Sequence, residues 1–167
     1  MRVAARNSEA AEVVTPPFRS VAFMLSSLGY AIARRFHQTL AALELEPGEF
    51  ALLRAVAAGD GEAQNALAER LHISPSWMVA IVDELERREL LERRPHARDR
   101  RVRNLHLTSG GKRLLKQAER RARQFDRQVS DPLTETELQQ LFELLQRIGA
   151  GLDLDPGAAH AALRDRV

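Results

Sequence analysis

The chain contains no cysteine among its 167 residues. This absence excludes disulfide bonds, thiol-based redox sensing, thiolate nucleophiles and zinc sites with cysteine ligands. The length allows one globular domain with a real hydrophobic core, with or without dimerisation arms, and it argues against a multidomain enzyme.

Long apolar segments are also missing. The N-terminal stretch MRVAARNSEAAEVV has no continuous apolar region like that of a signal peptide, and no segment is apolar over the length needed to span a membrane. We therefore expect a cytoplasmic protein with no membrane-spanning segment.

Signatures of catalysis and of cofactor binding are missing as well. The sequence has no glycine-rich phosphate loop, no nucleophile elbow and no HExxH motif. The histidines show no close metal-ligand spacing; they are His37, His72, His96, His106 and His160. We expect no enzymatic activity, no metal site and no cofactor.

Positive charge is present but unevenly placed. The net charge is +2, yet residues 87–103 hold eight arginines and three acids, a local balance of +5 that leaves −3 for the rest. Arginine makes up 23 of the 25 basic residues, which suits phosphate and groove recognition, although a GC-rich genome would also produce this composition. The composition of the whole chain explains less easily why the arginines cluster at residues 87–103.

Hydrophobic periodicity predicts a long helix near the N-terminus. Residues 1–15 show no clear periodicity and are expected to form a frayed arm. From Pro16 onward, apolar residues recur every three or four positions and form one helical stripe: Val21, Leu25, Leu28, Ile32, Phe36, Leu40 and Leu43. A helix this long usually packs against something beyond its own domain core.

Three shorter helices are predicted next. Pro47 favours the first position of a helix that ends near Gly59, and QNALAERL predicts the following one. His72 tolerates the positive φ of a helix end, and Ser74 with Pro75 makes a favourable start for the third. The short gap between the last two helices indicates a helix-turn-helix.

A β-hairpin and two amphipathic helices complete the predicted order. LLERR and RVRNLHL read as strands around the charged turn PHARDR, with Leu105 and Leu107 facing inward. Thr108 caps a helix that ends at Asp131, and Thr134 begins the last helix with a capping box. The two apolar stripes are Leu115, Ala118, Ala122, Phe125 and Val129, then Leu138, Leu141, Leu145, Ile148 and Leu152. These stripes and that of the first helix need a partner.

From about Phe18 to Leu152 the sequence resembles the MarR family of bacterial transcription regulators. The resemblance is carried by LAERLHISPSWMVAIVDELERRELLERRPHARDRRVRNLHLTSGGKRLL, above all by VDELE at 82–86, LLERR at 90–94, DRR at 99–101 and LHLTSGGKRLL. It implies a mainly α fold with a small β-hairpin wing, that is, a winged helix-turn-helix with N- and C-terminal dimerisation helices. The implied segments are an arm at 1–15, the domain at 16–152 and a tail at 153–167, with dimerisation helices at about 16–43 and 109–152 and a DNA-binding core at about 47–108.

The resemblance also implies a function. It implies a homodimer, most often a repressor, that binds a palindromic operator in double-stranded DNA with half-sites about one turn apart. A small aromatic or amphipathic effector that relieves repression is a further hypothesis. Phe23, Tyr30 and Phe50 could line its pocket, but they serve equally well as dimer core and are not assigned to a ligand.

Two positions depart from the family pattern. Glu89 stands where many relatives have glycine after the recognition helix, and Ala80 stands where many carry arginine within it. Loss of that arginine motivates an alternative function, a winged-helix dimer that acts through protein contacts with weak or no DNA binding.

A helical projection divides residues 74–87 into two faces at about 100° per residue. The core face holds Met78, Ile81, Val82, Leu85 and the capping Ser74, and the outer face holds Ser76, Ala80, Asp83 and Arg87, bordered by Val79 and Glu84. Small apolar side chains can contact thymine methyl groups, and serine can reach a base edge or a phosphate. The candidate DNA contacts of this helix are Ser74, Ser76, Val79, Ala80 and Arg87.

Each of these residues also has a plainer explanation. Exposed Val79 and Ala80 are ordinary surface residues, and Arg87 and Arg88 are typical helix-end cations. Trp77 is expected to cover the edge of the core, with a DNA contact as the alternative.

The predicted wing supplies the remaining candidates. Arg100 and Arg101 are expected to enter the minor groove, because a narrow groove concentrates negative potential. Arg94 and Arg98 are expected to contact phosphates. The resemblance gives Asp99 the role of orienting a neighbouring arginine; a solvated charged loop is the alternative.

Overall fold

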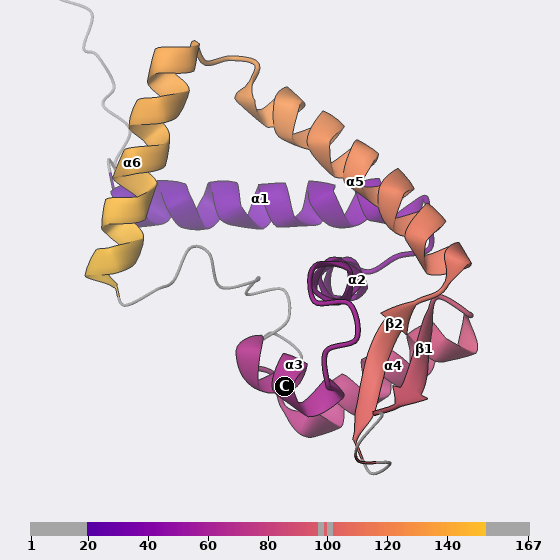
Figure 1. The fold of residues 1–167 in the computed structure, drawn as a ribbon. Helices are drawn as coiled ribbons and strands as arrows, with labels where there is room; N and C mark the ends of the chain where they lie inside the picture. Colours follow the sequence, from indigo (N-terminus) through magenta and orange to yellow (C-terminus); the bar gives the residue numbers. More distant parts are fainter. Residues whose placement is uncertain (1–19, 97–98, 100–101, 153–167) are drawn as a thin grey trace, which may run out of the picture. The chain divides into compact units, whose positions relative to one another are not determined.

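The computed structural model describes residues 20–96, 99 and 102–152. The chain divides into two compact units, residues 1–33 and 34–167, and each is considered by itself. The elements follow the predicted order (Figure 1): α1 Val21–Ala41, α2 Pro47–Ala58, α3 Gln64–Arg70, α4 Pro75–Arg87, β1 Leu91–Pro95, β2 Arg103–Leu107, α5 Ser109–Ser130 and α6 Glu135–Gly151. The predicted mainly α fold with a two-stranded wing is confirmed.

The predicted ends of the helix-turn-helix are confirmed. Pro47 begins α2, and a capping box joins Glu46 to Glu49. His72 has a φ of 52°, the left-handed conformation that the sequence required after α3. The Ser74 side chain accepts a hydrogen bond from the Trp77 backbone at 3.3 Å, which satisfies a free N–H in the first turn of α4.

The wing is an antiparallel hairpin in which Leu91 lies opposite Leu107 and Pro95 opposite Arg103. Leu105 and Leu107 are buried, as their alternation predicted. β2 also forms a bridge to Ala63, just before α3. The hairpin is thereby joined to the helix-turn-helix.

At the start of α5 the backbone passes so close to the residue before β1 that position 111 requires glycine. A Cβ at Gly111 would lie 2.0 Å from the Leu90 carbonyl oxygen, inside van der Waals contact. Thr108 caps the helix by accepting from the Gly111 N–H at 2.9 Å, and its hydroxyl donates to the Glu89 carbonyl at 2.6 Å. The chain therefore turns from β2 into α5 in close contact with the end of α4.

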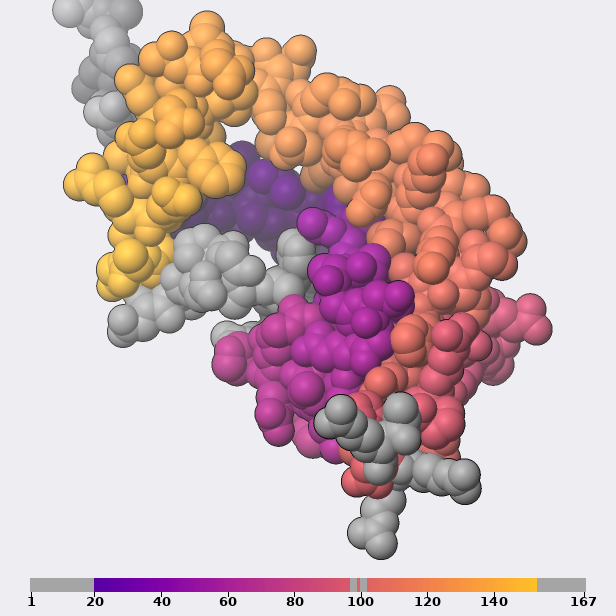
Figure 2. All heavy atoms as spheres, viewed as in Figure 1, coloured from indigo at the N-terminus to yellow at the C-terminus, as the bar shows by residue number. Residues whose placement is uncertain are grey.

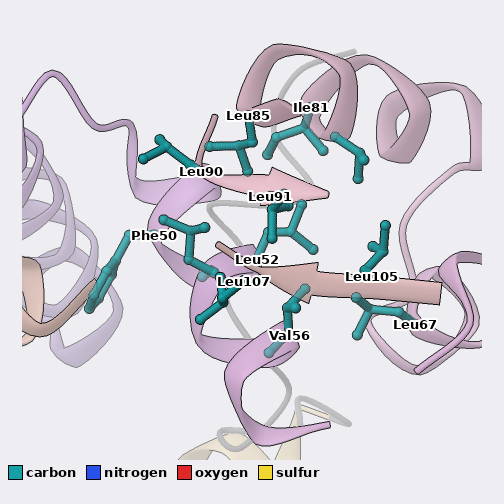
Figure 3. Close-up of a cluster of buried hydrophobic side chains, with 14 of the residues drawn as sticks. Phe50, Leu52, Val56, Leu67, Ile81, Leu85, Leu90, Leu91, Leu105 and Leu107 are labelled. Carbon is teal, nitrogen blue, oxygen red and sulfur yellow. The ribbon is translucent and has the colours of Figure 1, made fainter. Parts of the chain in front are cut away.

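The core joins α2, α3, α4, the hairpin and the first turns of α5. Leu52 and Val56 of α2 meet Leu91 and Leu105 of the strands, and Leu85 of α4 lies above them (Figure 3). This core holds the two helices of the helix-turn-helix against the wing.

The apolar stripes of the long helices are only partly buried in the single chain. Leu40 at the end of α1 and Leu115 and Ala118 in α5 are buried. Farther along, large apolar side chains are exposed: Phe23, Met24, Leu28, Tyr30 and Ile32 in α1, Val129 in α5, and Leu141, Phe142, Leu144 and Leu145 in α6. The apolar stripes therefore continue beyond the buried core.

Candidate nucleic-acid interface

The two predicted faces of α4 are confirmed by burial except at Ser74, which was placed on the core face but is exposed because it is the cap that precedes the helix. Met78, Ile81, Val82 and Leu85 are buried, and the side chains on the opposite face are exposed: Ser76, Val79, Ala80, Asp83 and Arg87. Val79 is 45% exposed although it is a large apolar side chain. The helix thus presents short side chains on an outer face while its inner face anchors it to the core.

Arg87 pairs with Glu84 of its own helix. Its Nε and Nη2 atoms donate to the two Glu84 carboxylate oxygens at 3.0 and 2.6 Å. The hydrogen bond from Arg87 lowers the pKa of Glu84, and the same bond raises the pKa of Arg87. Arg87 therefore has to leave Glu84, or share it, in order to contact a phosphate.

Arg93 is a structural residue of the interface that the sequence analysis did not single out. Its guanidinium contacts Asp83 and Glu86 of α4, each at 2.6 Å, and its Nε donates to Gln64 of α3 at 2.9 Å. One signal was available, since side chains two residues apart in a strand share a face and the residue two positions earlier is the apolar Leu91. Arg93 links the wing to both helices of the helix-turn-helix.

The wing candidates are described only in part. Arg94 is 58% exposed and pairs with Glu92 of its own strand. The Asp99 residue is exposed, and its backbone carbonyl accepts a hydrogen bond from the Val102 N–H at 3.1 Å. Arg98, Arg100 and Arg101 lie outside the described residues.

Two aromatic residues have core contacts. Trp77 is half-buried and packs against the core cluster, as expected for a side chain that covers its edge. Phe50 is buried, with its ring 5.9 Å from that of Phe36 in an edge-on arrangement. The guanidinium carbon of Arg54 lies over the Phe50 ring, 5.8 Å from the ring centroid.

A groove of about 450 Å³ is lined by the end of α2 and by α5. The atoms of these two helices lie side by side in the space-filling view (Figure 2). Leu107 and Leu115 contribute apolar lining. The charged lining consists of the cations Lys112, Lys116 and Arg123 and the acids Asp60 and Glu119. Asp60 Oδ1 accepts a hydrogen bond from His106 Nδ1 at 3.0 Å.

The described part of the chain has neither a membrane-spanning helix nor a cluster of metal ligands. No described helix is long and apolar enough to cross a membrane. Among residues 20–96, 99 and 102–152, no three histidine, aspartate or glutamate side chains are grouped as metal ligands would be.

Known proteins resemble this chain in sequence and in fold. The sequence profile of the MarR family matches residues 43–102. A protein of Thauera aromatica, named as a transcriptional regulatory protein for the hcr operon, is 31% identical over 144 residues, which cover 85% of this chain and 87% of the relative. The name of this relative describes a transcriptional regulator, the function class expected from the sequence.

Two solved structures have DNA bound. The repressor CouR on a 23-mer DNA duplex is 27% identical, has a TM-score of 0.70 and aligns over 78% of this chain and 92% of its own. A mutant MarR from E. coli with operator DNA shares the fold, at 20% identity and a TM-score of 0.67, over 76% of this chain and 91% of its own. The order of helices and wing, the matched profile and the near full-length regulator lead to one conclusion: the chain is a transcriptional regulator that belongs to the MarR family.

Proposed function

We propose that the protein is a homodimeric repressor that binds a pseudo-palindromic operator, with α4 of each protomer in the major groove. The observation that carries the proposal is the two-faced α4, whose buried side anchors it and whose outer side exposes Ser76, Val79 and Ala80. Short side chains let a helix lie deep in the groove, where Val79 and Ala80 can contact thymine methyl groups. Such a regulator works in the cytoplasm.

The other contacts follow from charge. Ser74, Ser76 and Arg87 are within reach of phosphates or base edges at the start and end of α4, and Arg94 and Arg98 are assigned to phosphates along the wing. Arg100 and Arg101 enter the minor groove, with Asp99 orienting an arginine beside it. The DNA-bound CouR structure supports this assignment by its similar fold.

Dimerisation is supported by the apolar side chains that a single chain leaves exposed. Phe23 in α1 and Phe142 in α6 are 59% and 66% exposed, within larger apolar sets on each helix. Contiguous exposed apolar surface is typical of an interface. We assign the helices within 16–43 and 109–152 to the dimer and residues 47–108 to DNA binding, with an arm at 1–15 and a tail at 153–167.

The test is DNA selection from a random duplex library, followed by affinity measurements on the enriched sequence. We expect a palindrome whose half-sites are about one turn apart. With about six to ten phosphates neutralised per dimer, the affinity should fall steeply between roughly 50 and 200 mM salt. No enrichment at low salt would refute the proposal.

A second function keeps the dimer but replaces DNA with a protein partner. The exposed Val79 and the lack of a hydrogen-bonding side chain at Ala80 favour it. The variants Arg100→Ala and Arg101→Ala distinguish the two. Unchanged DNA affinity and an unchanged salt slope in both would favour the protein-binding function.

Release by a small molecule is the third part of the proposal. The groove between α2 and α5 combines apolar Leu115 with three cations and two acids, and this net positive lining suits an amphipathic anion. A panel of aromatic carboxylates should include one that lowers operator affinity, and Lys116→Met should weaken its effect. Release that is equally strong with Lys116→Met would place the effector elsewhere.

A further inference from the structure

The beginning of α2 carries a buried charge. Glu49 is the one buried charged side chain among the residues that the structure describes, with 8% of its surface exposed. A buried carboxylate costs free energy unless charge and hydrogen bonds compensate for its lost hydration. The Glu46 backbone N–H donates to Glu49 Oε2 at 2.8 Å, which is part of that compensation.

The compensating charge comes from the far end of α4. Arg88 directly follows α4, and its Nη1 lies 3.2 Å from both carboxylate oxygens of Glu49. Its Nη2 donates to the Glu44 carbonyl at 2.6 Å. Arg88 is 20% exposed, so that water screens this pair less than it screens the surface pairs of Arg87 and Arg94.

The Glu44 carbonyl belongs to the corner between α1 and α2. Glu44 has a φ of 52°, and its N–H donates to the carbonyl of Ala41, the last residue of α1. Glu46, in the same corner, pairs with His37 of α1 at 3.1 Å. The corner is therefore hydrogen-bonded to the end of α1 on one side and to Arg88 on the other.

The remainder of α4 packs within the winged region. Its neighbours are α3 and β1, and its buried residues Met78, Val82 and Leu85 belong to the common core. Removal of Arg88 should leave this packing in place. It would release the end of α4 from the corner that follows α1.

We propose that Arg88 and Glu49 form a buried strut that holds α4 at a set orientation to the end of α1 and so sets the separation of the two recognition helices in the dimer. The inference rests on the proposed function, because it requires α1 to take part in a dimer that reads two half-sites. Arg88 is then a positioning residue for DNA recognition and does not itself contact DNA.

The test compares operators whose half-sites are moved apart or together by one base pair, which turns one half-site by about 34–36°. The wild-type protein should bind the selected spacing about tenfold or more tightly than the altered ones. In the Arg88→Met variant this preference should fall below about threefold, with the salt slope unchanged because no phosphate contact is lost. Arg70→Met, which breaks an exposed pair with Glu62, is the matched control and should keep the preference.

A second readout needs no DNA. Because the chain has no cysteine, an Ala80→Cys variant accepts one spin label per protomer on the outer face of α4. The distance distribution between the two labels should be narrow in the dimer and should broaden or shift with Arg88→Met. If Arg88→Met does not fold, Arg88→Lys serves, since it keeps the charge but cannot hold both Glu49 and the Glu44 carbonyl in the same geometry.

The outcomes separate the two proposals. Absence of operator binding or of a dimer in the wild-type protein overturns the proposed function. The strut is overturned by a different result, in which the wild-type protein discriminates between spacings. In that result the Arg88 variant binds all spacings more weakly to the same extent and keeps the narrow distance distribution, so that Arg88 is an ordinary stabilising residue.

Discussion

Arg93 of the first wing strand lies 2.6 Å from Asp83 on the outer side of the recognition helix. The same guanidinium reaches Glu86 one turn farther along α4. One side chain thereby compensates the negative charge of two acids of α4, and it holds the wing against the helix.

Loss of Arg93 should destabilise the fold far more than loss of its neighbour. Arg93 is 19% exposed, and its removal leaves Asp83, Glu86 and Gln64 without their shared donor. Arg93→Met should lower the free energy of unfolding by about 1–3 kcal/mol. Arg94→Met, which removes a 58% exposed surface pair in the same strand, should cost less than about 1 kcal/mol. Urea denaturation of both variants at one protein concentration measures this, and equal losses would contradict it.

Gly111→Ala should be strongly destabilising, by about 3 kcal/mol or more, because its Cβ would overlap the Leu90 carbonyl. The control is Gly151→Ala, whose added Cβ meets nothing within 4 Å. Thermal unfolding should separate the two by well over 5 °C, given typical domain entropies. Near-native stability of Gly111→Ala would show that the turn into α5 can shift without cost.

Replacement of Glu89 by glycine should stabilise the protein by about 1 kcal/mol. Glu89 has a φ of 55°, a conformation that is strained for residues with a Cβ and that glycine adopts without strain. Gln117→Gly is the matched control, because it places glycine within α5 and should cost about 1 kcal/mol. Denaturation midpoints that move in the same direction for both variants would refute the explanation.

The N-terminus of α6 should lose stability in acid. The Thr134 backbone N–H and, with a smaller effect, the Thr134 hydroxyl donate hydrogen bonds to the Glu137 carboxylate. These hydrogen bonds lower the pKa of Glu137 from its usual value of 4.5. A carboxyl group whose pKa is lower in the folded state contributes stability above its unfolded pKa, and loses it as the pH falls through the folded pKa. Helix content followed by circular dichroism should therefore fall below about pH 4.5. Glu137→Gln should flatten that part of the curve; the same acid dependence in both proteins would assign it to other carboxylates.

Local signals predicted most of the fold. Proline and serine at helix starts, the capping box of the last helix and the two periodicities predicted α2 through α6 and the hairpin, because each depends on residues a few positions apart. The inner face of α4 followed from the same spacing. The described part of α1 ends at Ala41, two residues before the apolar stripe ends, because the chain turns with Glu44 in the left-handed region.

Long-range pairing could not be predicted in this way. Four arginines look alike within the basic run. In the structure, Arg87 and Arg94 pair with acids of their own elements. By contrast, Arg88 and Arg93 pair with acids of other elements. Only chain folding brings Glu49 to Arg88, 39 residues away. The sequence by itself determined the elements, the faces of the helices and the clustering of charge, since these depend on neighbours along the chain. The tertiary structure decided which arginines remain at the surface and which hold the recognition helix, because that choice depends on the acids that packing places within reach of each guanidinium.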